Sequence, residues 1–349
     1  MNKKRFLFGI FVFSFFVGYM GSFLYETTLS QKETKSYPKT AYFRVWRADA
    51  LIKNKTIKSL TQALVDPKNG GYTISTIPPP QPIGLYNKND LYIIAWKYFK
   101  FPPKKISDRT YLWQMETPFS ITIPPPEKYK KHFNKIFTYY KPATDGKKVI
   151  YVPIPYNYDK IIREYDISKK EILVMHISRY ATGHNYKQRT NSVKWFLENH
   201  PDDILFYGND WNKIKPDLSE EAKNLFDKKY GGYIPDKILA LSKAKFTLAY
   251  ENERFDDYVS EKIFDAMAAG SVPIYSGASN ITDYVPKECF IDFHQFKNHE
   301  ELYTYISTMP DKTYNSYLKC IKNYMAEPEK NLNHPKQVTT LILSHIENK

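Results

Sequence analysis

The chain has few of the residues that build disulfide frameworks and metal clusters. Among 349 residues it has two cysteines, Cys289 and Cys320, and eight histidines that do not cluster along the sequence. Two cysteines cannot form a dense disulfide framework, and their spacing is not that of a metal site, although one bridge between them stays possible. The sequence also shows no internal repeat and no Ser/His/Asp arrangement. These absences argue against a disulfide scaffold, a repeat protein and a triad hydrolase.

No nucleic-acid-binding motif is present either, although the chain is strongly basic. Its formal net charge is +14, and the positive residues are spread along its whole length. Such a surface suits an anionic ligand, a membrane surface or nucleic acid, of which we give nucleic acid the lowest weight. A chain of this length, with 42% hydrophobic residues, has enough apolar material for a large core. We therefore expect two domains.

The N-terminus carries one long uncharged segment. Residues 6–25 read FLFGIFVFSFFVGYMGSFLY, and 20 residues of helix span about 30 Å, the thickness of a bilayer core. The basic residues in 1–5 predict a cytoplasmic tail. We predict a single-pass signal anchor at 6–25 and a polar stem at 26–39, which places the rest of the chain on the non-cytoplasmic side. The alternative is a cleaved signal peptide.

Residues 40–167 predict a small, proline-rich α/β domain. Runs of β-branched and aromatic residues predict strands near 42–46, 90–96, 111–115, 135–140 and 149–153. Apolar residues at helical spacing predict a helix within 51–65.

Residues 168–330 show a more regular alternation. Strands are predicted at 171–178, 203–207, 246–250 and 272–275, and helices at 191–199, 218–228, 236–242 and 261–269. Alternation of this kind predicts a doubly wound parallel sheet. Further helices are predicted at 300–307 and 312–325, and residues 331–349 form a C-terminal helix from about 335 to 346.

The stretch 246–277 is the most informative part of the chain. Ser260 is suited to cap the 261–269 helix, and Gly270 fits the position just after its end. Lys262 then lies in the first helical turn, where the helix dipole disfavours a cation. An anion bound at this helix N-terminus would remove the conflict. The alternative is a solvated surface lysine.

Residues 250–286, YENERFDDYVSEKIFDAMAAGSVPIYSGASNITDYVP, resemble the donor-binding signature of the family 10 glycosyltransferases, the α1,3/4-fucosyltransferases. The signature reads F/Y-E-N, Y-V/I-T/S-E-K, A-G and V-P-I/V, and residues 289–296 continue it. In the first domain, Trp113–Pro118 resembles the family's W-E-S-P segment, and the pairs that follow resemble its F-N and T-Y-R patterns. Tyr140 stands where many members have arginine, so the role of that arginine is not carried over.

The resemblance implies an α/β fold of two Rossmann-like domains that face a cleft, the GT-B architecture. It also implies the site. Glu116, after the 111–115 strand, is the expected general base, and Arg189, just before the 191–199 helix, is expected to hold a diphosphate together with Lys262. The remaining donor-binding residues are Tyr258 and Glu261 at the nucleoside and Asn252 and Glu251 in the pocket. We expect no metal and no cofactor, because Asp256-Asp257 lacks the D-x-D spacing.

The activity implied by the resemblance is the inverting transfer of L-fucose from GDP-fucose to a glycan hydroxyl, with an α1,3 or α1,4 link. The expected partners are GDP-fucose, a glycan acceptor and the membrane, with no nucleic acid. In a eukaryote the topology would place the chain in the Golgi membrane. Two alternatives stay open: a related transferase that uses another nucleotide sugar, and an inactive, membrane-tethered glycan-binding module. Asn54 and Asn280 begin N-glycosylation acceptor patterns.

Overall fold

The computed structural model describes residues 40–44, 73–75, 91–96, 110–114, 130–158, 170–180 and 186–347, with side chains from residue 110 onward. The expected anchor at 6–25, the stem at 26–39, the helix within 51–65, Asn54 and Glu116 lie outside these ranges. Among the described helices, none combines the length and the apolar character needed to cross a membrane.

The first domain is built on a parallel sheet in the order β2-β1-β3-β4-β5-β6. Its strands are β1 Thr40–Arg44, β2 Thr73–Ser75, β3 Leu91–Trp96, β4 Thr110–Gln114, β5 Ile136–Thr138 and β6 Val149–Tyr151. All except β2 match strands predicted from sequence. The side chains of β4 and β5 are all buried, as expected for central strands covered on both faces.

The second domain contains a parallel sheet in the order β11-β10-β9-β7-β8. Its strands are β7 Ile172–Ile177, β8 Ile204–Tyr207, β9 Ala244–Tyr250, β10 Val272–Ser276 and β11 Ile291–Asp292. The helices are α4 Tyr186–Asn199, α5 Glu220–Lys229, α6 Lys237–Leu241, α7 Glu261–Ala268, α8 His299–Ser307 and α9 Asp311–Ala326. Both sheets therefore confirm the α/β class predicted from the alternating pattern.

Short 3₁₀ turns connect these elements. They are η3 Lys130–His132, η4 Lys141–Ala143, η7 Pro201–Asp203, η8 Trp211–Asp217, η9 Ile281–Asp283, η10 Lys287–Cys289, η11 Phe293–Gln295 and η12 Pro328–Lys330. Gly270, just after α7, has a φ of 67°, so the predicted glycine at the helix end is confirmed.

One predicted helix begins earlier than expected. The sequence places its start at Asn191, whereas α4 begins at Tyr186. Lys187, Gln188 and Arg189 are straight-chain residues with good helix propensity, and they continue the helix one turn toward its N-terminus. Arg189 is therefore inside the first turns of α4 and not ahead of the helix.

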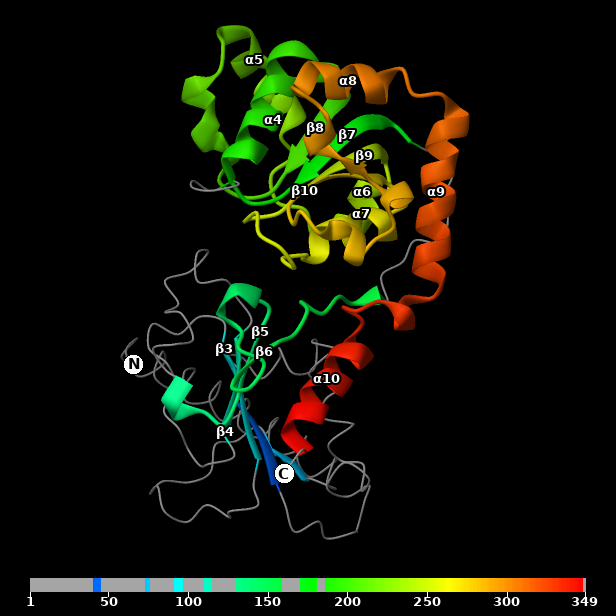
Figure 1. Ribbon diagram of the computed structural model, residues 1–349. Helices are drawn as coiled ribbons and strands as arrows, with labels where there is room; N and C mark the ends of the chain where they lie inside the picture. Colours follow the sequence, from blue (N-terminus) through cyan, green and yellow to red (C-terminus); the bar gives the residue numbers. More distant parts are fainter. Residues whose placement is uncertain are drawn as a thin grey trace, which may run out of the picture.

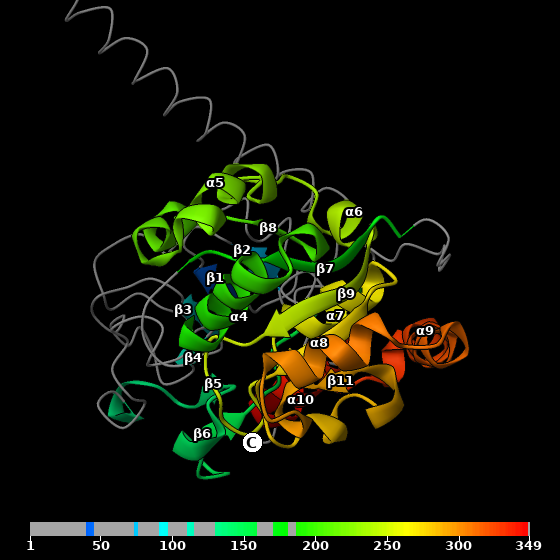
Figure 2. The same ribbon diagram turned by 90° about the horizontal axis from the view of Figure 1, so that it is seen from above.

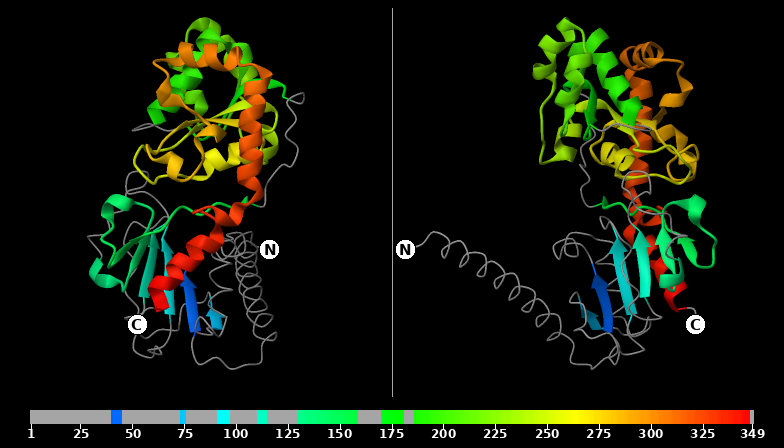
Figure 3. Two further views of the ribbon diagram at one scale, coloured as in Figure 1. Left: turned by 45° about the vertical axis from the view of Figure 1, so that its right-hand side comes forward. Right: turned by 90° about the vertical axis from the view of Figure 1, so that its left-hand side faces the viewer.

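The two domains are stacked, so that the second lies over the first in the view from above (Figures 1 and 2), and the chain passes between them twice (Figure 1). The first passage follows β6. In the second, the long helix α9 runs along the second domain, and the final helix α10, Pro335–Glu347, lies beside the first sheet (Figures 1 and 3). The backbone N–H of Tyr156 donates to the Asn333 carbonyl at 2.9 Å, and the Tyr158 hydroxyl donates to Asn333 Oδ1 at 2.8 Å. The C-terminal segment thus returns to the first domain.

A disulfide bond joins η10 to α9. It links Cys289 and Cys320, which are 31 residues apart, and leaves no free cysteine in the described part of the chain. The single disulfide bridge that the sequence left open is therefore formed. The bond ties the segment after β10 to the helix that leads out of the second domain.

We expect the double substitution Cys289→Ser and Cys320→Ser to lower the free energy of unfolding by about 3 to 4 kcal/mol, because a loop of this length is restricted in the unfolded chain. Denaturant unfolding of the parent and the variant measures the difference. Equal midpoints with equal slopes would contradict a stabilising role for the bond.

Candidate functional site

The carboxyl ends of β7 and β9 define the place where a ligand is expected. The second sheet extends outward from β7 in both directions, first to β8 and then through β9. In doubly wound sheets, ligands bind at the carboxyl ends of the strands where the order reverses. A small depression lies there, with room for about one water molecule. It is lined by residues of β7, β9, α6 and α7, namely His176, Ile177, Ser178, Lys237, Leu241, Thr247, Leu248, Ala249 and Lys262.

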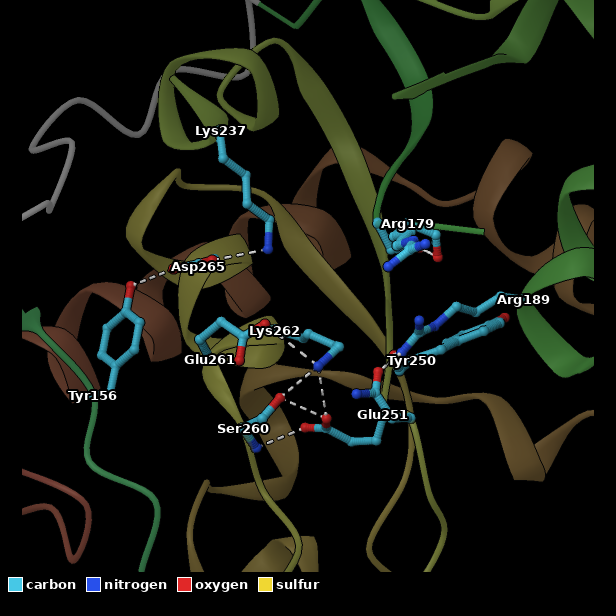
Figure 4. Close-up of polar contacts among 12 residues, drawn as sticks. Tyr156, Arg179, Arg189, Lys237, Tyr250, Glu251, Ser260, Glu261, Lys262 and Asp265 are labelled. Atoms are coloured by element: carbon cyan, nitrogen blue, oxygen red, sulfur yellow. Dashed lines mark hydrogen bonds and ion pairs between the residues drawn. The ribbon is translucent and has the colours of Figure 1, made fainter. Parts of the chain in front are cut away.

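Glu251, directly after β9, is the centre of the polar network beside this depression (Figure 4). Its side chain is fully buried. Oε1 accepts from the Ser260 backbone N–H at 2.7 Å, and Oε2 accepts from Ser260 Oγ at 2.6 Å and from Lys262 Nζ at 3.2 Å. A buried carboxylate with this many donors is held in one orientation.

The requirement for Gly277 follows from this packing. A Cβ at that position would lie 2.6 Å from Glu251 Cγ and 2.4 Å from the Tyr275 hydroxyl oxygen. Both atoms belong to buried residues, so neither has room to move. The glycine that closes β10 therefore leaves space for the central carboxylate.

Lys262 has its compensating anion inside the protein. Its Nζ donates to Ser260 Oγ at 2.8 Å, to Glu251 Oε2 and to Glu261 Oε1 at 3.3 Å, and 13% of its side chain is exposed. Burial opposes the charged form, but the Glu251 and Glu261 carboxylates raise the pKa of Lys262 above its ordinary value. Glu251 thus relieves the conflict between Lys262 and the helix dipole, and Lys262 is not the solvated surface lysine of the alternative prediction.

Ser260 stands at the predicted N-cap position of α7 but bonds differently. Its side chain makes no cap hydrogen bond to the helix. Instead its hydroxyl donates to Glu251 and accepts from Lys262. The Ser260 hydroxyl therefore connects the Glu251 carboxylate to the Lys262 ammonium group and does not cap the helix.

Arg189 reaches the same place from α4. Its Nε and Nη2 donate to the Tyr250 carbonyl at 3.1 and 2.7 Å, and Nη2 donates to Asn252 Oδ1 at 2.6 Å. The guanidinium carbon lies 4.8 Å from the centre of the Tyr186 ring, and 2% of the residue is exposed. Burial lowers the pKa of Arg189, which the charge of Glu251 partly offsets. Arginine stays charged in proteins, so this is a fixed cation.

The structure brings Arg189 and Lys262 to the two sides of Glu251 (Figure 4). Among the described residues, Arg189 Nη1 has no hydrogen-bond partner. Five of the six predicted donor residues are hydrogen-bonded to one another, in two groups: Arg189 with Asn252, and Lys262 with Glu251 and Glu261. Glu251 was predicted as a pocket residue, but its role as the counter-ion of Lys262 was not predicted.

Glu261 is half-exposed at the edge of this cluster. Burial tends to raise its pKa, but the charges of Lys262 and Lys237 lower it below the ordinary value. Lys237 itself pairs with Asp265 at 2.9 Å, and the Tyr156 hydroxyl donates to the other Asp265 oxygen at 3.0 Å. Sequence reasoning missed this second pair, because its members lie on different helices with no shared motif.

Tyr258 takes part in aromatic contacts on both sides of the domain boundary. The residue is 4% exposed, and its ring packs on Phe255 and on Tyr139 of the first domain, with centroid distances of 4.9 and 5.8 Å. It therefore lies at the junction of the two domains.

His176 supports the floor of the depression. Nδ1 lies 3.1 Å from the Leu248 carbonyl, which can only accept, so Nδ1 carries the proton and Nε2 accepts from Ser178 Oγ at 2.7 Å. Burial and the nearby charge of Arg189 lower the pKa of His176 to about 3. The imidazole is therefore neutral in the folded protein.

This neutral histidine makes stability depend on pH. The unfolded chain binds a proton at His176 below a pH of about 6.5, while the folded chain does not until about pH 3. His176 therefore has no effect on the pH dependence of the free energy of unfolding above pH 6.5. Below pH 6.5 it lowers that free energy as the pH falls, by up to about 1.4 kcal/mol per pH unit. Urea midpoints between pH 6.5 and 4 should fall less steeply for His176→Gln than for the parent. Equal slopes would contradict this assignment.

The described residues contain no group of three or more His, Cys, Asp or Glu side chains that is able to hold a metal ion. Asp256 and Asp257 serve other contacts: the first accepts a short hydrogen bond from Ser279, and the second pairs with Lys141. Asn280, which begins a glycosylation pattern, donates to Asp257 and Asp283 at 3.1 and 3.0 Å. Its amide is thus already used within the protein.

Comparison with known proteins adds to this picture. The family model described as glycosyltransferase family 10 (fucosyltransferase), C-terminal part, matches residues 167–344. A mouse 4-galactosyl-N-acetylglucosaminide 3-α-L-fucosyltransferase is 26% identical over 258 residues, which cover 69% of this chain and 62% of that enzyme's length. The matched segment thus spans less than two thirds of this relative.

Two solved structures of α1,3-fucosyltransferases are similar in fold, each at 17% identity. One, with GDP, has a TM-score of 0.59 and covers 91% of this chain and 93% of its own. The other, with GDP-fucose, has a TM-score of 0.56 and the same coverage. At this identity the likeness concerns the fold, and it confirms the predicted α/β architecture of two Rossmann-like domains. The N-terminal transmembrane helix stays a prediction.

Proposed function

Because this chain belongs to glycosyltransferase family 10, the fucosyltransferase family, we propose that it transfers L-fucose from GDP-fucose to a glycan hydroxyl with inversion, in α1,3 or α1,4 linkage. The observation that carries the proposal is the cluster of Arg189, Glu251 and Lys262. It lies at the switch point of the second sheet, within the residues that the family model matches.

The two buried cations suit the leaving GDP. Charge develops on the diphosphate as the glycosidic bond breaks, and fixed cations in a dry site stabilise it without reorganisation. Arg189 binds the diphosphate through Nη1. Lys262 binds it at the position that Glu261, the most exposed partner of Lys262, now occupies. In this proposal a phosphate oxygen replaces Glu261 on Lys262, and the released carboxylate turns to the ribose of the nucleoside. The proposal requires no metal or cofactor.

Glu116 remains the proposed general base. Strand β4 ends at Gln114, so Glu116 follows the carboxyl end of a central strand of the first sheet. That is the edge at which ligands meet such sheets. A base in the first domain is then able to take the proton of the acceptor hydroxyl while the second domain holds the donor. Attack from the face opposite to GDP gives inversion.

The test is a panel of nucleotide sugars with the full chain. GDP is expected to raise the melting temperature, because it binds the folded state. GDP-fucose is expected to be hydrolysed slowly and to be used with oligosaccharide acceptors, with EDTA present or absent. Turnover of another nucleotide sugar would favour the related transferase, since the cluster contacts the diphosphate and not the sugar. Glycan binding without any turnover would favour the inactive module.

We also propose that the chain is a single-pass membrane protein with a cytoplasmic N-terminus, in the Golgi membrane if the source is eukaryotic. The uncharged run at 6–25 supports the anchor. The disulfide between Cys289 and Cys320 supports an oxidising, non-cytoplasmic location for the folded part.

Removal of residues 1–39 is expected to release a folded, soluble protein that keeps GDP binding, because the described core begins with β1 at Thr40. Membrane fractionation of the full and shortened chains, followed by a melting curve with GDP, measures both properties. A shortened chain that aggregates and binds no GDP would show that the apolar run belongs to the folded core.

A further inference from the structure

A second buried charge lies at the junction of the domains, away from the cluster of Arg189, Glu251 and Lys262. Asp257 belongs to the loop between β9 and α7 and is 6% exposed. Its φ is 65°, a left-handed conformation that non-glycine residues rarely adopt and that aspartate tolerates better than most. Unusual backbone geometry of this kind persists only where the surroundings enforce it.

Within the second domain, Asp257 is fixed by two neighbours. Tyr284 donates its hydroxyl proton to Oδ1 at 2.8 Å, and Asn280 Nδ2 donates to the same oxygen at 3.1 Å. The Asp257 backbone N–H in turn donates to Asn280 Oδ1 at 2.8 Å. Burial raises the pKa of Asp257, but the ammonium group of Lys141 and these donors hold it below the ordinary value. The carboxylate is therefore ionised.

The remaining partners come from the first domain. Lys141, in η4, places Nζ 2.8 Å from Asp257 Oδ2. Tyr151, at the end of β6, forms a short hydrogen bond with the Tyr284 hydroxyl and lies 3.4 Å from the Asp257 carbonyl oxygen. Residues more than 100 positions apart in sequence thus meet at one carboxylate. Lys141 is 55% exposed, so the pair lies at the rim of the junction.

The loop that carries Asp257 also carries proposed donor residues. It begins at Glu251 and Asn252, and it continues through Tyr258 to Ser260 and α7. Phe255 of the loop packs on Tyr140 at 5.3 Å, and Tyr258 packs on Tyr139 at 5.8 Å. The described part of the first domain therefore contacts the donor loop through one ion pair, two aromatic pairs and the Tyr151 hydroxyl. A shift between the domains moves this loop.

We propose that Asp257 is a positioning residue for glycosyl transfer: its ion pair with Lys141 sets the donor loop against the first domain, so that the two halves of the site are in register. The inference rests on the proposed function. It adds a residue that takes no direct part in the reaction. Asp257 touches neither donor nor acceptor in this proposal. It acts through the loop and through the relative position of the domains.

The test uses the full chain in detergent. Lys141→Met is expected to lower kcat about tenfold with unchanged affinity for GDP, because misplacement of reacting groups by about 1 Å costs up to 10²-fold in rate. Lys141→Arg should restore kcat, since it keeps the charge. Lys141→Met combined with Asp257→Asn should be no slower than Lys141→Met alone, because the two residues act as one unit.

Lys130→Met is the matched control. It removes a lysine whose Nζ lies 2.8 Å from Asp145, a pair that lies wholly within the first domain. This variant should keep both kcat and GDP affinity. If Lys141→Met kept the parental kcat and lost only thermal stability, the pair would be structural and the proposal would be overturned. A loss of GDP affinity equal to the loss of kcat would also overturn it.

A second measurement does not depend on fucosyl transfer. Lys147 in the first domain and Lys312 on α9 are exposed, and both native cysteines are paired, so Lys147→Cys with Lys312→Cys gives two sites for spin labels. The parent should show a narrow distribution of label distances and Lys141→Met a broader one. Identical distributions would overturn the proposal. A parent that transfers no fucose would instead refute the proposed function and leave this result standing.

Discussion

Lys262→Met is expected to abolish most of the thermal protection by GDP and to slow transfer more than it weakens binding. A charged hydrogen bond contributes about 1.5 to 3 kcal/mol, which corresponds to GDP binding that is weaker by about 10- to 100-fold. The loss of rate should reach about 10²- to 10³-fold, because the ammonium group faces the charge that develops on the diphosphate. Calorimetric titration with GDP and steady-state kinetics measure the two effects.

The structure shows why Lys262→Met needs to be measured together with a second substitution. Removal of Lys262 leaves the fully buried Glu251 carboxylate without its cation, and an uncompensated buried charge costs about 3 to 5 kcal/mol of stability. Lys262→Met together with Glu251→Gln removes that charge as well. The double variant should regain much of the stability and still bind GDP poorly. If it binds GDP as the parent does, Lys262 does not hold the diphosphate.

Glu116→Gln is expected to lower kcat by about 10²- to 10⁴-fold while GDP binding stays at the parental level, because loss of a general base affects the proton transfer and not the donor site. Glutamine keeps the volume and the hydrogen-bonding capacity of glutamate but cannot take a proton. The measurement is kcat with saturating donor, together with the GDP-dependent melting temperature and a circular dichroism spectrum.

Two results would remove Glu116 from the mechanism. The first is a folded variant with near-parental kcat. The second is a variant that folds poorly and loses GDP affinity, which would mean that this carboxylate stabilises the turn before Pro118. In either case the search for the base would move to Glu251 or Asp257, although both are held by buried partners in the structure.

The second domain was predictable because its signals are local. Apolar runs bounded by glycine and proline predicted β7 to β10 to within one or two residues at each end. The family resemblance predicted Arg189, Glu251, Asn252 and Lys262 as donor-binding residues, and that role stays a prediction. The counter-ion of Lys262 was not predictable. Glu251 reaches it only because β9 and α7 pack together and Gly277 leaves room, and these conditions depend on the folded backbone.

Long-range pairs carry no local signal. Lys141 and Asp257 lie in different domains, and the sequence offered Asp257 only as a rejected metal ligand. The pairing of Cys289 with Cys320 likewise stayed open until the packing of η10 against α9 was known. The sequence prediction began α4 at Asn191, although Lys187, Gln188 and Arg189 favour another helical turn before it. Glu116 and the membrane segment lie outside the described residues and stay predictions.

The return of α10 to the first domain has a consequence for engineering. Val338, Ile342 and Ile346 of this helix are buried, and Figure 3 shows the helix beside the first sheet. The first domain is therefore discontinuous in sequence, with its last piece encoded after the whole second domain. A chimera that exchanges the first domain between relatives must transplant residues 335–347 along with the N-terminal part, since a single crossover point would join the sheet of one parent to the helix of the other.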